Sequence, residues 1–88
     1  MAKVIFNYKG IETIIQCNIN DKIKDIYKRY ETKIGIDISK LFFIYNGNQI
    51  KDNLTLNEII NEEDKRRNII NILVNENNEI IINENEKI

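Results

Sequence analysis

The chain has 88 residues, of which 42% are hydrophobic and 31% charged, and its formal net charge is −1. A chain of this length forms one domain with a small core, which leaves little room for a deep pocket. The near-zero net charge argues against an electrostatic surface for nucleic acid or for an anionic membrane. No apolar run reaches the length of a bilayer span, so we expect no membrane partner.

The residue types also limit the chemistry that the chain can perform. There is no His, which removes most general-base, metal-ligand and catalytic-triad arrangements. Cys17 is the only cysteine, so no internal disulfide can form, and the first residues enter a strand pattern instead of a signal peptide. We therefore expect no enzymatic activity, no metal and no cofactor, and a location in the cytoplasm or nucleus.

The first predicted elements form an antiparallel hairpin. Residues 4–8 and 11–17 are β-rich runs joined by a Gly turn. Side chains alternate between the faces of a strand, so every second residue of each run points the same way. We place Cys17 inside as a core residue, because a nucleophilic thiol would lack a His partner. The predicted inner face holds Val4, Phe6, Thr13, Ile15 and Cys17.

A helix is predicted over residues 22–34. Apolar residues recur at i, i+3, i+4, i+7 and i+11, which places them on one stripe. The preceding Asn20-Asp21 is typical of a helix start, and Gly35 suits the left-handed position after a helix end. The stripe consists of Ile23, Ile26, Tyr27, Tyr30 and Ile34, and the outer face carries Lys22, Lys24, Lys28, Arg29 and Lys33. Because Asp25 and Glu31 interrupt these bases, we expect a solvated face.

The second half of the chain predicts another hairpin and a returning strand. Residues 41–45 and 48–50 flank Asn46-Gly47, a pair typical of a type I′ turn. Residues 56–60 predict a short helical turn, residues 62–67 a charged loop, and residues 69–74 the last strand. Alternation places Ile70, Ile72 and Val74 on one face of that strand, and Ile69, Asn71 and Leu73 on the other.

These elements predict an α+β fold, a β-grasp roll in which a mixed sheet of about five strands packs on one main helix. We assign residues 1–74 to this domain and residues 75–88 to a tail rich in Asn and Glu. Two interpretations of the tail stay open. It is either a mobile end or linker, or an added strand that pairs with a sheet edge of its own or another chain.

The segment Leu41–Leu56 resembles ubiquitin-like proteins. It has an apolar strand, a Gly turn, a Gln-Ile pair, an Asp and a Thr-Leu step in the order found in that family. Further matching features, all in one register, are Asp21, Ile23, Lys33, Gly35-Ile36, Ile44, Gly47, Gln49, Asp52 and Thr55-Leu56. The Asp52-Asn53 step is also similar to small ubiquitin-like modifiers, so the branch of the superfamily stays open.

The resemblance implies a protein-binding patch on the exposed sheet face. The positions matching ubiquitin's patch are Ile44 and Gly47, with Asn71 and Leu73 from the last strand. An apolar residue of the first turn of ubiquitin has no clear counterpart here, and Lys9, which stands nearest to that position, would make this edge of the patch cationic. Strand alternation gives a related result, because a buried Phe43 would leave Phe42 and Ile44 pointing outward. An exposed apolar cluster usually marks a partner site. The candidate partner-binding residues are Phe42, Ile44, Gly47, Asn71, Leu73 and Lys9.

Covalent modifiers of this family end in Gly-Gly, whereas no Gly follows Gly47 here, and Asn48 replaces the principal chain-forming lysine. We therefore expect a monomeric, non-covalent interaction domain of a larger protein, with partners from the ubiquitin system or other proteins that bind ubiquitin folds. Strand exchange through the tail stays open. The alternatives are a covalent modifier cut from a longer precursor, a small nucleic-acid-binding module using the basic helix face, and a passive structural module.

Overall fold

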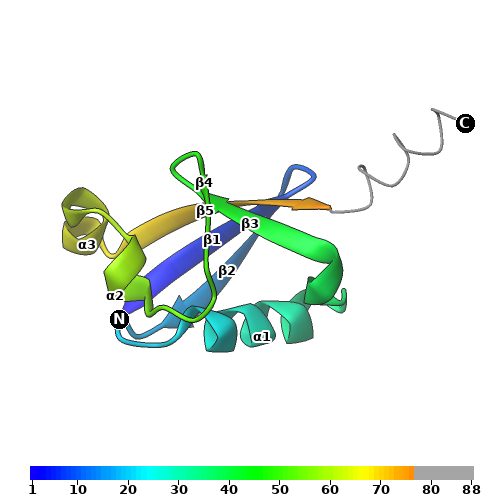
Figure 1. Cartoon of the computed structure of the whole chain (residues 1–88), viewed down its shortest axis with the longest axis horizontal. Helices are drawn as coiled ribbons and strands as arrows, with labels where there is room; N and C mark the ends of the chain where they lie inside the picture. Colours follow the sequence, from blue (N-terminus) through cyan, green and yellow to red (C-terminus); the bar gives the residue numbers. More distant parts are fainter. Residues whose placement is uncertain (77–88) are drawn as a thin grey trace, which may run out of the picture.

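In the computed structural model, which describes residues 1–76, a mixed five-stranded sheet is crossed on one face by a single long helix (Figure 1). The strand order is β2-β1-β5-β3-β4, with β1 and β5 parallel and the other pairs antiparallel. This architecture confirms the predicted β-grasp fold. The elements are β1 (Ala2–Tyr8), β2 (Ile11–Cys17), α1 (Ile23–Ile34), the 3₁₀ helix η1 (Ile38–Lys40), β3 (Leu41–Tyr45), β4 (Asn48–Gln49), α2 (Leu56–Ile59), α3 (Glu62–Arg67) and β5 (Ile69–Glu76).

Both hairpins turn through two residues with positive φ. Asn46 and Gly47 have φ values of 54° and 83°, and Lys9 and Gly10 have 52° and 80°. Positive φ at both central positions is the requirement of a type I′ turn, whose twist matches that of the flanking strands. The turn predicted at Asn46-Gly47 is therefore confirmed, and a similar turn joins β1 to β2.

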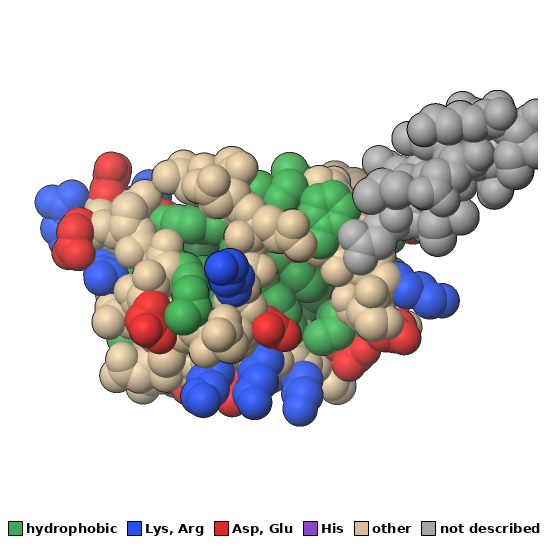
Figure 2. All heavy atoms as spheres, in the orientation of Figure 1, with side chains coloured by type: hydrophobic (Ala, Val, Ile, Leu, Met, Phe, Trp, Pro, Cys, Tyr) green, Lys and Arg blue, Asp and Glu red, His purple; other side chains and the backbone are tan. Residues whose placement is uncertain are grey.

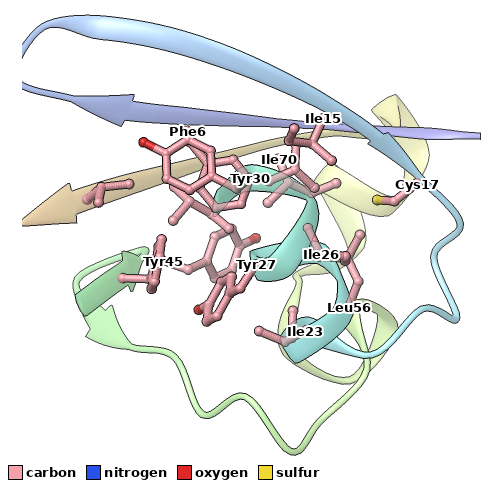
Figure 3. Close-up of a cluster of buried hydrophobic side chains, with 14 of the residues drawn as sticks. Phe6, Ile15, Cys17, Ile23, Ile26, Tyr27, Tyr30, Tyr45, Leu56 and Ile70 are labelled. Carbon is pink, nitrogen blue, oxygen red and sulfur yellow. The ribbon is translucent and has the colours of Figure 1, made fainter. Parts of the chain in front are cut away.

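The core lies between the sheet and α1. Aromatic rings form its centre, where Phe6 stacks on Tyr30 at a centroid distance of 4.1 Å and Tyr27 stacks on Phe43 at 3.8 Å. The same rings from β1, α1 and β3 also meet edge to face, and Figure 3 shows Phe6, Tyr27 and Tyr30 converging with the aliphatic side chains around them. The predicted inner faces of β1 and β2 and the predicted helix stripe all contribute to this core.

The start of α1 differs from the prediction. The N-cap residue is Lys22, and its side chain makes no capping bond. The Asp21 carboxylate instead accepts from the main-chain N–H of Asn18 at 2.9 Å. The first helical N–H groups donate to main-chain carbonyls of the loop before α2. The N–H of Ile23 donates to the carbonyl of Leu54 at 2.8 Å, and the N–H of Lys24 donates to the carbonyl of Asp52 at 3.2 Å. The prediction of a cap at Asn20-Asp21 was therefore wrong, because a distant loop satisfies the groups that a local side chain usually satisfies.

The segment predicted as a charged loop is the helix α3, so that prediction was also wrong. Asn61 caps the helix by accepting from the N–H of Asp64 at 2.8 Å, and Asn68 ends it in the left-handed conformation with φ 56°. The first turn is acidic and the last turn is basic, which complements the helix dipole at both ends. Caps and dipole together hold a helix that has no buried residue.

Other boundaries shift by one or two residues. β5 continues past the predicted end at Val74, and its last residues pair with β3 through Phe42↔Asn75 and Leu41↔Glu76. The idea that the tail adds a separate strand concerns residues that lie mostly outside the described part of the chain. None of the helices in residues 1–76 combines the length and the hydropathy of a transmembrane span.

Candidate partner-binding surface

The sheet has an outer face, opposite α1, on which apolar side chains of β3 and β5 lie next to each other. The register pairs Ile44 of β3 directly with Leu73 of β5, and Leu73 also pairs with Asn7 of β1. Leu73 is 48% exposed and Ile44 is half-buried, whereas the neighbouring Phe43 is only 4% exposed. The predicted facing of Phe43 toward the core and of Ile44 toward the outside is confirmed.

A shallow hollow lies on this outer face, and we call it the Ile44 hollow. Its lining includes four of the predicted site residues, namely Ile44, Gly47, Asn71 and Leu73. Asn7, Asn46 and the buried Ile72 complete the lining, and sequence reasoning assigned none of the three to the partner-binding site. Asn7 could not be found from local pattern, because it joins the hollow only through the parallel pairing of β1 with β5. Asn46 was assigned to the turn, and its place in the lining follows from the hairpin that the turn closes.

Phe42 does not line the Ile44 hollow. Phe42 lies two residues before Ile44 on β3 and pairs with Asn75 of β5. It lines a separate hollow together with Ile38 of η1 and Ile50. Its side chain is half-buried. The structure therefore places Phe42 beside the Ile44 hollow instead of within its lining.

Lys9 lies in a different environment from the other predicted site residues. Its Nζ forms an ion pair with Glu76 Oε1 at 2.5 Å and stands 5.4 Å from the ring centroid of Tyr8. The hydrogen bond and charge of Glu76 raise the pKa of Lys9. With Ile11, Tyr30 and neighbouring apolar residues, Lys9 lines a hollow between the β1–β2 turn and the C-terminal end of α1. The structure thus does not place Lys9 on the lining of the Ile44 hollow.

A profile of the ubiquitin family matches residues 4–77, which include nearly all of the sheet and α1. The chain belongs to the ubiquitin family. A comparison with curated proteins gives no significant match.

The basic helix face of this ubiquitin-like domain is partly occupied by internal contacts. Lys33 Nζ donates to the carbonyl of Ile14 at 3.0 Å, and Arg29 donates to the carbonyl of Gln16 at 3.3 Å while pairing with Asp21. These contacts cover carbonyls on the free edge of β2, a way in which proteins protect an edge strand. Figure 2 shows Lys and Arg side chains gathered along α1.

Within residues 1–76, no group of three or more His, Cys, Asp or Glu side chains is arranged to hold a metal ion. Cys17 is 2% exposed, and burial raises the pKa of its thiol, which keeps it protonated and unreactive. The thiol therefore lies in the core as predicted.

Proposed function

We propose that this ubiquitin-like domain binds other proteins non-covalently through its outer sheet face and performs no chemistry itself. The supporting observation is the direct pairing of Ile44 with Leu73, beside a shallow hollow, on a face that α1 does not cover. Adjacent exposed apolar side chains of this kind usually mark a partner surface. The match to the ubiquitin family supports the fold, and the pairing of Ile44 with Leu73 supports the choice of the outer sheet face as the binding surface.

The binding mechanism is burial of apolar area. A partner's apolar side chain seats between Ile44 and Leu73, and each square ångström of apolar surface removed from water contributes about 25 cal/mol. Gly47 lines the hollow and has open space where a Cβ would lie, so a partner's backbone can approach closely there. Phe42 and Asn71 extend the contact to either side. Because the hollow is shallow and small, we expect modest affinity and a transient complex.

The non-covalent mode is supported by the sequence from the end of β5 onward. Residues 48–88 contain no Gly, and Val74 leads into Asn75-Glu76-Asn77-Asn78. That composition differs from the small, flexible Gly-Gly end that conjugating enzymes activate. Because the domain belongs to the ubiquitin family, we expect its partners among proteins of the ubiquitin system and other proteins that recognise ubiquitin folds.

The test is an affinity measurement with a panel of domains that bind ubiquitin folds. Ile44→Ala and Leu73→Ala should each weaken binding by roughly tenfold, equivalent to ~1.4 kcal/mol, while circular dichroism shows an intact fold. Ile11→Ala is the matched control, because Ile11 is 70% exposed and lines the other hollow. Equal affinity of all variants for a bound domain, or loss of binding only with Ile11→Ala, would contradict the proposal.

A further inference from the structure

The outer sheet face is nearly free of charge, although the chain contains 13 basic and 14 acidic residues. The strand registers identify the side chains that share this face. The apolar ones are Ile5, Ile14, Phe42, Ile44, Ile69 and Leu73, and the amides are Asn7, Gln16, Gln49, Asn71 and Asn75. Of the outward-facing strand residues that these registers identify, only Lys3 and Glu12 carry a charge.

Neither of these charges lies in the Ile44 hollow. Glu12 of β2 pairs with Asn7 on the side of β1 that faces away from β5, so β1 lies between Glu12 and Leu73. Lys3 pairs with Ile69, which lies four residues from Leu73, or about 13 Å along a strand. The polar side chains that line the hollow, which we call its amide rim, are instead those of Asn7, Asn46 and Asn71.

An amide rim favours one class of contact. Each Asn side chain can both donate and accept a hydrogen bond, so it can pair with a main-chain group or with another amide. A charged group buried against this surface would lose hydration, and no charged side chain lines the hollow to compensate for that loss. An apolar group would lose nothing by the same burial and would gain contact with Ile44 and Leu73.

We propose that the surface recognised by the Ile44 hollow is uncharged, with an apolar side chain at its centre and main-chain or side-chain amides around it. This inference rests on the proposed function and specifies the chemistry of the partner. Selection then depends on hydrogen bonds and shape instead of ion pairs. Association through this face lacks electrostatic steering, and the affinity depends little on ionic strength.

The test uses three small probes of equal chain length that differ in their head group: pentanamide, pentanoate and pentylammonium. Each is titrated into the whole isotope-labelled chain while NMR follows the methyl signals of Ile44 and Leu73 and the side-chain amides of Asn7 and Asn71. Pentanamide should shift these signals several-fold more than either charged probe. Equal or larger shifts with a charged probe, or no shift with pentanamide, would overturn the inference.

Asn71→Asp provides a matched variant, because Asn71 is exposed and the substitution changes the charge of the rim with almost no change in shape. It should make pentylammonium the strongest probe at Ile44 and Leu73 and leave pentanoate the weakest. An unchanged order of the probes in a folded Asn71→Asp domain would show that the rim does not control selection.

A salt series separates this inference from the proposed function. A domain that binds at Ile44 with a strongly salt-dependent affinity would refute the uncharged surface and leave the proposed function intact. If no domain of the panel binds at Ile44 while pentanamide still binds selectively there, the proposed function fails and the chemistry of the hollow stands.

Discussion

Phe42 and Phe43 have the same side chain and follow each other in the chain, yet they lie in different environments. Phe43 is 4% exposed and stacks on Tyr27, whereas Phe42 is half-buried at the outer side of β3. A strand sends successive side chains to opposite faces, so one register fixes both positions. The same register turns Ile44 outward.

Substituting each Phe by Ala therefore has different consequences. Phe43→Ala removes a ring from the aromatic core and should lower the free energy of unfolding by about 3–5 kcal/mol. Phe42→Ala should cost well under half of that, because part of the ring is already in water. Urea denaturation of both variants measures the difference. Equal losses in the free energy of unfolding would contradict the assignment of Phe43 to the inner face and Phe42 to the outer face of β3.

The buried tyrosines differ in what their hydroxyl groups contact. Tyr27 Oη and Tyr30 Oη are buried and have no hydrogen-bond partner among residues 1–76, and burial raises the pKa of both side chains. Tyr45 Oη instead donates to the carboxylate of Asp64 and accepts from the N–H of Asn61 at 3.1 Å. One hydroxyl is therefore satisfied and the other two are not.

Tyr→Phe substitutions should separate these cases by thermal or urea unfolding. Tyr45→Phe should destabilise the domain by about 1–3 kcal/mol, because it removes a hydrogen bond to a charged group and leaves the N–H of Asn61 unpaired. Tyr27→Phe and Tyr30→Phe should be neutral or stabilising, since each removes only an unsatisfied hydroxyl. A larger loss with Tyr30→Phe than with Tyr45→Phe would contradict this account.

At the scale of the residue, local pattern predicted some positions well and others not at all. The outward facing of Ile44 follows from alternation within one strand, so the sequence alone was sufficient. The place of Asn7 beside Leu73 depends on the parallel pairing of β1 with β5, which joins residues far apart in the chain. Lys9 illustrates the same limit, because its partner Glu76 lies beyond the predicted end of the last strand.

At the scale of the element, α3 is held mainly by polar contacts. Asp64 connects the helix to the sheet by accepting from Tyr45 Oη, and it also pairs with Arg67 at 2.7 Å. These contacts, led by the Tyr45 hydroxyl, hold the pKa of Asp64 below its ordinary value. A carboxylate whose pKa is lower in the folded state stabilises the fold above its unfolded pKa, which is about 3.9.

The stability of the domain should therefore fall as the pH falls below about 5 toward the lowered pKa of Asp64. Asp64→Asn should reduce stability at pH 7 and flatten the pH dependence across this window. Some dependence should remain, because hydrogen bonds also lower the pKa of Asp37 and Glu58. Urea titrations at several pH values test this prediction, and parallel curves for wild type and variant would refute it.

The composition of α3 explains why a loop was predicted for residues 62–67. A six-residue helix without a buried residue lacks the apolar periodicity that usually reveals a helix. The available signals were the Asn61 cap, three residues before Asp64, and the change from acidic to basic residues within one and a half turns. The cap of α1 was predicted wrongly for another reason, since the first N–H groups of that helix are satisfied by the carbonyls of Asp52 and Leu54.

At the scale of the whole molecule, the two sides of the sheet differ in chemistry. α1 covers the inner face and carries most of its charge outward, and Lys33 and Arg29 also contact the free edge of β2. The outer face exposes apolar and amide side chains and only Lys3 and Glu12 as charges among its paired strand residues. This division favours the sheet face over the helix face as the partner surface.

The most direct test of the central claim is an NMR titration of the whole isotope-labelled chain with domains that bind ubiquitin folds. We predict that the shifted signals centre on Ile44, Leu73 and Asn71 of the outer face, and that Ile44→Ala makes these shifts much smaller at the same partner concentration. Shifts that centre instead on Lys24 and Lys28 of α1, with the outer face unmoved, would contradict the proposed partner surface.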